Sequence, residues 1–422
     1  MATNEWLGTA TSVAQVDTFT PATVEINDIF TLTATGFDGT SDSISYTAVA
    51  ATAADVAAAL VIAWNAATGS LFTGITASGT VTVILTSDTA GTAFKVASST
   101  TDGGGAGTQT FARVATTANG GVNDWQDATN WSLGTVPGED TGGDNTEDVY
   151  IRDSAVDILY GLDNTGSTYY LKSLHADMTY TGVIGHNEEA GYEGDYLEIE
   201  TALLYIGEDF CNTNSAGSSR LKIDIGAYDQ KCIVTVYNTS TSNDTGKPAF
   251  RLKANNSLHE IRDIRKGTVG ICCLPSETGE VASIFQSWTT SKGSDSTLSI
   301  GQGLTVTTIE ALGGISYIKQ ASGKTITTLT SEGGTMLTLG AGAITTLNTD
   351  GGSVTPSSTG VITACNVKSG TCDFTQLAEP RTVTTLKVDE GATLKIDEDV
   401  VTLTNNIQAY DGGRLQYRIS AV

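Results

Sequence analysis

Apolar residues and threonines recur in one short phrase along the C-terminal third of the chain. The copies are Val306-Thr-Thr-Ile309, Ile326-Thr-Thr-Leu329, Ile344-Thr-Thr-Leu347, Ile362-Thr-Ala-Cys365 and Val383-Thr-Thr-Leu386. They start 20, 18, 18 and 21 residues apart, and glycine follows each within five residues. Short apolar stretches between glycine turns predict strands. A repeat of such strands near twenty residues is typical of one coil of a β-solenoid.

In a second phrase, two apolar residues are separated by one intervening residue and are followed by Gly or Asp. It occurs as Leu204-Tyr-Ile-Gly207, Ile223-Asp-Ile-Gly226, Leu298-Ser-Ile-Gly301, Leu337-Thr-Leu-Gly340 and Leu394-Lys-Ile-Asp397. Ile326 and Leu337 are eleven residues apart, as are Val383 and Leu394, so one repeat holds both phrases. We therefore expect residues 151–422 to form a β-solenoid with coils of about 18–21 residues. In each coil Ile and Leu should point inward, and Thr should point outward or stack in ladders with the neighbouring coil.

Residues 1–115 follow a different pattern. Stretches of alternating polarity such as "TVEINDIFTLTATG" predict strands, and "TAADVAAALVIAWNAA" predicts one helix. Thr52 and Asp55 resemble a capping box, and Val56, Leu60 and Trp64 recur on one helical face. We expect a small α+β domain in which this helix crosses a mostly antiparallel sheet, and we interpret it as an anchor.

Residues 116–150 join the two regions. They begin as a linker rich in Gly, Thr and Ala and continue into a stretch that contains Trp125, Trp131 and Pro137. The first coil of a solenoid exposes apolar residues and unpaired backbone groups, and two tryptophans with a proline-fixed turn can cover them. We therefore expect a linker followed by a Trp-rich cap.

The charge balance limits the classes of partner. The 422 residues carry 22 Lys and Arg against 47 Asp and Glu, a net charge of -25, although only 16% of residues are charged. Such a chain repels phosphate backbones, so no nucleic-acid partner is expected. "MATNEWLGTA" has no signal-peptide pattern and no apolar run long enough to span a membrane follows, which predicts synthesis in the cytoplasm and no membrane partner.

The best local candidate for catalysis is "HNEEAGYEGDYLEIE", residues 186–200. Its carboxylates are Glu188, Glu189, Glu193, Asp195, Glu198 and Glu200, and Tyr192 and Tyr196 are available to stack on sugar rings. Glycan cleavage needs two carboxylates at a defined separation, and nothing in the sequence singles out two of the six. A solvated acidic loop between coils is the competing interpretation, and we predict no catalytic residues.

Two further segments contain charged residues in close succession. The loop at 138–148 holds Glu139, Asp140, Asp144, Glu147 and Asp148, whose oxygens suit calcium, but it lacks EF-hand spacing and is interpreted as a solvated loop. Arg262, Arg265 and Lys266 form the most basic stretch, which either faces an acidic neighbour or pairs with the nearby Glu260 and Asp263.

The histidines and cysteines show no ligand spacing. His175, His186 and His259 lie far apart, and the cysteines at 211, 232, 272, 273, 365 and 372 form no CxxC motif. Buried or surface histidines and buried free thiols are the expected interpretations. No phosphate- or dinucleotide-binding motif is present, so we predict no cofactor-binding and no metal-binding residues.

Two stretches resemble known families. "ISYTAVAATAADVAAALVIAWNA" resembles small α+β domains that recur in tailed-phage virion proteins. The segment with Trp125, Asn130-Trp131, Gly134, Val136-Pro137 and Asp148-Val-Tyr-Ile151 is similar to the one that opens right-handed β-helices in bacterial surface adhesins, autotransporter-like passengers and some phage surface proteins. The resemblance implies a right-handed parallel β-helix and a place on a virion surface.

These resemblances imply a non-enzymatic structural protein, a capsid decoration or cement protein that projects a rod. Its partner would be the major capsid protein or another virion protein, and its class implies a homotrimer assembled in the host cytoplasm. The alternatives are a receptor-binding tailspike or tail fibre that binds or cleaves a host surface glycan, and a bacterial surface adhesin.

Overall fold

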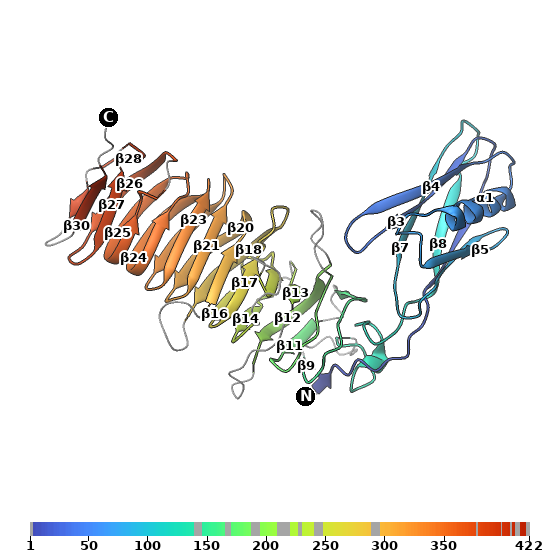
Figure 1. The fold of residues 1–422 in the computed structure, drawn as a ribbon, viewed down its shortest axis with the longest axis horizontal. Helices are drawn as coiled ribbons and strands as arrows, with labels where there is room; N and C mark the ends of the chain where they lie inside the picture. Colours follow the sequence, from blue (N-terminus) through green and yellow to red (C-terminus); the bar gives the residue numbers. More distant parts are fainter. Residues whose placement is uncertain are drawn as a thin grey trace.

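The computed structural model describes residues 3–138, 146–164, 170–186, 195–208, 220–226, 230–239, 248–287, 296–376, 379–397, 399–405, 407–409 and 414–418. The chain is mainly β, with a small N-terminal α+β part and a long parallel sheet wound into a β-helix (Figure 1). This confirms the predicted fold class. The wound part is called the rod below.

Two ladders of parallel strands run along the rod. The first contains β1 (Thr3–Glu5), β9 (Asp148–Ile151), β11 (Tyr170–Ala176), β12 (Leu197–Ile206), β14 (Ile233–Val236), β16 (Glu260–Ile264), β18 (Thr278–Gln286), β20 (Gly303–Ala311), β22 (Thr325–Ser331), β24 (Ala343–Pro356), β25 (Ile362–Asp373), β26 (Arg381–Val388), β28 (Val401–Leu403) and β29 (Gln408–Ala409).

The second ladder contains β10 (Asp163–Asn164), the start of β12, β13 (Leu221–Asp224), β15 (Phe250–Lys253), β17 (Gly267–Ile271), β19 (Ser296–Ile300), β21 (Ile315–Gln320), β23 (Thr335–Gly340), the ends of β24 and β25, β27 (Thr393–Asp397) and β30 (Arg414–Arg418). Long strands such as β24 and β25 pass from one ladder to the other within a coil.

Coil length changes along the rod. Ile344 lies against Ile362 and Ile362 against Val383, which gives coils of 18 and 21 residues as predicted. Nearer the N-terminal end the coils are longer: Leu174 pairs with Leu204 and Leu204 with Val234, thirty residues apart in each case. Residues 152–162, between β9 and β10, are one such longer segment among the described residues.

The first phrase forms a bent strand with two inward residues. Ile326 and Leu329 are 1% and 0% exposed, although residues three apart in a straight strand point to opposite faces. Ile326 pairs with Ile344 and Thr328 pairs with Thr346, and the residue between them in each strand is not paired. The strand therefore turns a corner between its two apolar residues. The threonine at the corner, Thr327, is exposed. The inward Ile and Leu of this phrase are confirmed.

The second phrase is not a uniform repeat. Leu298 lies against Ser316, which lies against Met336, so the inward residues of β23 are Met336 and Thr338 rather than Leu337. The prediction that Leu337 points inward was wrong, because a shift of one residue moves every side chain of a strand to the other face. The members of the second phrase also lie in different ladders. Leu204 belongs to the first ladder and Leu298 to the second.

A column of glycines explains why each phrase ends in Gly. Gly314, Gly334, Gly352 and Gly370 have φ of +76°, +69°, +69° and +72°, a region that L-residues with side chains rarely adopt. A Cβ on Gly352 would lie 2.5 Å from the carbonyl oxygen of Gly334 in the neighbouring coil. The corner therefore requires glycine for its backbone conformation and for the close approach of the coils.

The N-terminal unit has its own core between two antiparallel sheets. Their strands are, in order, β5 (Ile75–Ser78), β6 (Val83–Ser87), β2 (Val16–Ala22) and β8 (Thr110–Thr117), and β4 (Ser41–Thr47), β3 (Ile29–Thr35) and β7 (Lys95–Thr101). Helix α1 (Ala53–Ala66) buries Val56, Leu60 and Trp64 as predicted, and the Thr52 side chain accepts a hydrogen bond from the Asp55 amide at 3.2 Å. In the part of the chain that the structure describes, no helix has the length and apolarity to cross a membrane.

The N-terminal unit is inserted into the rod rather than placed before it. β1 pairs with β9 in the first coil, so residues 3–5 belong to the rod and the unit does not begin at residue 1. Val13 and Gly120 pair antiparallel where the chain enters and leaves the unit, with the Val13 amide donating to the Gly120 oxygen at 2.8 Å. Residues 14–119, bounded by this pair, are called the N-terminal unit below.

The Trp-rich segment closes the end of the rod core. Trp6, Trp125 and Trp131 are buried and pack edge to face, with ring centroids 5.1 and 4.6 Å apart. The side chain of Asn130 donates to the Gly121 and Asp124 oxygens and accepts from the Ala10 amide. The segment around residues 120–131 is thus fixed by the packing of its tryptophans and by the hydrogen bonds of Asn130.

Replacing Ile344 with Asp should destabilise the rod by about 4 kcal/mol or more, because it places a carboxylate in a narrow apolar core. Thr345→Asp, one residue further on the exposed face, should change the free energy of unfolding by about 0.5 kcal/mol or less. Chemical denaturation followed by circular dichroism measures both. Equal effects of the two substitutions would contradict the assignment of inward positions.

Candidate functional site

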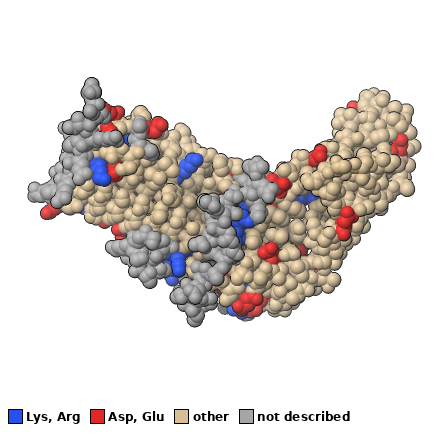
Figure 2. All heavy atoms as spheres, in the orientation of Figure 1, with Lys and Arg blue, Asp and Glu red and all other residues tan. Residues whose placement is uncertain are grey.

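A cleft lies where the N-terminal unit meets the first coils of the rod. It consists of two adjoining hollows of about 430 and 380 Å³ that share Phe37 and Leu159, and we call it the basal cleft. The molecule is concave between the rod and the unit (Figure 2). The lining residues from the unit include Asp38, Phe94 and Lys95, and those from the rod include Asp157, Tyr160, Asp163, His186, Asp195, Glu198 and Arg220.

Aromatic rings join the two sides of the basal cleft. Phe37 of the unit stacks on His186 of the rod, with ring centroids 4.3 Å apart and planes 11° from parallel. Tyr160 packs against both rings at 5.4 and 5.6 Å. The ammonium of Lys95 lies 4.6 Å above the Phe37 ring and pairs with Asp195 at 2.5 Å. Because Lys95 is 41% exposed, the stack contributes more than the ion pair to holding the unit against the rod.

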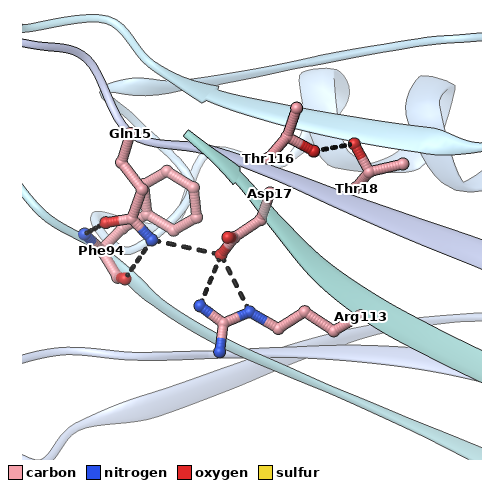
Figure 3. A network of polar contacts seen from close by, with 6 residues as sticks. All are labelled: Gln15, Asp17, Thr18, Phe94, Arg113 and Thr116. Atoms are coloured by element: carbon pink, nitrogen blue, oxygen red, sulfur yellow. Dashed lines mark hydrogen bonds and ion pairs between the residues drawn. The ribbon is translucent and has the colours of Figure 1, made fainter. Parts of the chain in front are cut away.

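A polar network inside the unit holds the wall of the basal cleft (Figure 3). Gln15 accepts from the Phe94 amide at 2.9 Å and donates to the Phe94 oxygen at 3.0 Å, which fixes this segment of backbone. Gln15 also donates to Asp17, which pairs with Arg113 at 2.8 Å. Since Phe94 and Lys95 both line the cleft, this network positions its inner surface.

Burial sets the protonation of His186. The ring is 14% exposed, and burial lowers its pKa to about 4, although the charge of Asp195 acts in the opposite direction. The imidazole is therefore neutral near pH 7 and packs as a flat, uncharged ring against Phe37.

The acidic segment at 186–200 meets the basal cleft in part. Asp195 and Glu198 line it together with Asp163 from β10, and burial and the charges of Asp224 and Asp163 raise the pKa of Glu198. The side chains of Glu188, Glu189, Tyr192 and Glu193 lie outside the described residues. The sequence did not indicate Asp163 or Phe37, because both come from segments far from the acidic stretch.

Tyr196 does not serve as an open sugar platform. Its ring is 4% exposed and lies 5.1 and 4.8 Å from the ammonium groups of Lys222 and Lys253. Its hydroxyl donates to Glu277 at 2.6 Å. The prediction that this ring is available for stacking was wrong, because the tyrosine packs against the outer surface of the second ladder.

The other charged candidates have structural partners. In the 138–148 loop, Glu147 accepts from the Gly138 amide and Asp148 pairs with Lys172, while residues 139–145 lie outside the described part. In the basic stretch, Arg262 pairs with Glu260 at 3.2 Å and Arg265 with Asp263 at 2.6 Å, as the second interpretation expected.

His259 and most of the described thiols lie in the interior of the rod. His259 is buried and accepts from the Cys232 amide at 3.1 Å, and burial lowers its pKa. Among the described cysteines, residues 232, 272, 273, 365 and 372 are free, and Cys211 lies outside the described residues. Burial raises the pKa of Cys272 to about 11 and that of Cys273 to about 12, so these thiols are protonated and unreactive near neutral pH.

Comparisons of the chain with protein-family models, with curated proteins and with solved structures found no match.

Lowering the pH should loosen the contact between the unit and the rod. The folded pKa of His186 lies below the unfolded value of about 6.5, so the stability that its neutral ring confers is complete above that pH and is lost as the pH falls toward 4. Between pH 7 and 4.5 we expect a loss of roughly 2 kcal/mol from this residue. His186→Phe, which keeps the stack but cannot bind a proton, should lack this part of the loss. Urea unfolding at both pH values measures the difference, and an identical pH dependence in the variant would contradict it.

Proposed function

We propose that this chain is a non-enzymatic structural protein of a tailed-phage virion surface, a capsid decoration protein that projects a β-helical rod. In this proposal the N-terminal unit binds the major capsid protein or another virion protein. The rod points away from the shell, and three copies form a homotrimer after synthesis in the host cytoplasm.

The insertion of the unit into the base of the rod carries the proposal. Two chain crossings at Val13 and Gly120, the stack of Phe37 on His186 and the ion pair of Lys95 with Asp195 connect the two parts. A unit held in this way transmits its orientation to the rod. An anchor bound to a shell would therefore set the direction in which the rod projects, which a flexible linker would not do.

The surface agrees with a role at high local density. Asp and Glu are scattered over the face seen in Figure 2 without gathering into one patch. A net charge of -25 favours solubility when many copies are made in one cell. Thr327 and Thr345 of the first phrase are exposed and add uncharged polar groups to the surface of the distal coils.

The basal cleft favours a second candidate, a receptor-binding tailspike that binds or cleaves a host glycan. Asp163, Asp195 and Glu198 line one hollow, and the raised pKa of Glu198 is of the kind that a general acid requires. Phe37 and Tyr160 supply aromatic surface beside these carboxylates. Under this proposal Glu198→Gln would abolish release of reducing ends from host polysaccharide, and under the first it would have no such effect.

Attachment can be tested by excising the unit while keeping the rod complete. Because Val13 and Gly120 form an antiparallel pair, residues 14–119 can be replaced by an Asn-Gly turn that joins them. We expect the shortened chain to fold as a rod that no longer binds capsids lacking this protein, whereas the full chain gives regular density on them in cryo-electron microscopy. The readout is occupancy on purified shells.

Deletion of residues 1–115 is the informative comparison. It also removes β1 and Trp6, so it should yield a less stable rod than the excision. Capsid binding by the rod without residues 14–119 would mean that the anchor lies outside the N-terminal unit. Absence of capsid binding by the full chain would contradict the first proposal and favour the glycan alternative.

A further inference from the structure

A row of aromatic rings stands on the outer face of the first ladder near the base of the rod. Tyr150, His175 and Tyr205 occupy matching positions in three successive coils. The His175 ring stacks between the two tyrosines at 4.3 and 4.7 Å, with interplanar angles of 15° and 27°. This sandwich fixes the plane of the imidazole and leaves its nitrogens directed along the surface of the ladder.

One imidazole nitrogen is oriented by a chain of hydrogen bonds. Ser173 donates its hydroxyl hydrogen to Asp148 at 2.5 Å, and Lys172 donates to the same carboxylate at 2.8 Å. The Ser173 oxygen lies 2.9 Å from Nε2 of His175. Because the serine hydrogen is directed to the carboxylate, the serine oxygen can only accept from the ring. The neutral imidazole therefore carries its hydrogen on Nε2 and presents a lone pair at Nδ1.

In this neutral form the Nδ1 lone pair faces a carboxylate rather than a hydrogen-bond donor. Nδ1 lies 2.6 Å from a carboxylate oxygen of Glu208, which follows β12 in the next coil. Asp177, one residue beyond the end of β11, brings a second carboxylate, and the three ligand atoms all lie within 4.8 Å of one another. Three electron-pair donors are thus close together, and a cation between them would offset the repulsion between the two carboxylates.

We propose that His175, Asp177 and Glu208 bind a divalent first-row transition metal ion, with zinc as the best match. One imidazole and two carboxylates are ligands that zinc accepts, and water would complete the coordination. Ser173 and Asp148 act as positioning residues that hold the imidazole tautomer. The Glu208 side chain is 28% exposed, so it can rotate to admit the ion from solvent.

Such an ion would connect two successive coils. His175 and Asp177 belong to one coil, and Glu208 belongs to the next. The metal would thus connect the long coils beside the cap, where paired residues of β11 and β12 are thirty positions apart. This inference concerns the rod itself and holds whether or not the unit binds a capsid.

The test uses untagged full-length chain, stripped with EDTA and dialysed. Isothermal titration with Zn²⁺ should give one ion per chain, and Co²⁺ should produce visible d–d absorption of a low-coordinate site. Zn²⁺ should also raise the melting temperature in a concentration-dependent way. Glu208→Gln and Asp177→Asn should each weaken Zn²⁺ binding at least tenfold, and Ser173→Ala should weaken it about 10- to 100-fold through loss of the tautomer.

Asp350→Asn is the matched control. Its carboxylate pairs with Lys368 on the outer surface far along the rod and is 26% exposed, close to Glu208. It should leave Zn²⁺ affinity and the Co²⁺ spectrum unchanged. A wild-type chain that takes up neither ion would show that a proton between His175 and Glu208 suffices and would overturn the proposal. Equal binding by Glu208→Gln and wild type would overturn it as well.

Discussion

The parallel register between successive coils is the constraint on which the rest of the structure depends. Each inward residue lies above the equivalent residue of the coil before, as Ile326, Ile344 and Ile362 do. Their burial removes a continuous column of apolar surface from water, and the backbone groups of each coil are satisfied by the next. The column tolerates variation in side-chain size, since Cys365 takes the place of Leu347, but it requires a glycine at the corner where two coils approach.

The same constraint bears on how the N-terminal unit is attached. Extra residues between strands lengthen a coil without breaking the ladder, as in the thirty-residue coils, whereas the N-terminal unit leaves and returns at the end of the rod, where it interrupts only the cap. The chain accordingly completes β1, leaves at Val13, folds the unit and returns at Gly120 before it forms the cap and β9. The buried tryptophans then cover the final apolar layer, and Phe37 and Lys95 reach across to the first coils.

Much of this fold could be predicted from the sequence because the repeat is local. Ile and Leu in the first phrase, the glycine corners, helix α1 and the Trp cap each have a short-range signal. The second phrase misled at Leu337, since its period-2 pattern is the same in either register and only the neighbouring coil decides which face is buried. The insertion at Val13 and Gly120 leaves no local pattern. The residues of the basal cleft and the donors around His175 come together only through coil-to-coil contact, at separations such as the 33 residues between His175 and Glu208.

Coil length separates the rod into two regions with different chemistry. The distal coils of 18 to 21 residues consist almost entirely of strands and corners, so they lengthen the rod and leave few residues in loops. The proximal coils have longer segments between strands, and these segments hold Tyr160 and His186 at the basal cleft and Glu208 beside His175. Longer loops give polar side chains room to converge away from the apolar column, which a minimal coil does not offer. Among the described residues, the basal cleft and the proposed metal site therefore both lie at the end of the rod that carries the N-terminal unit.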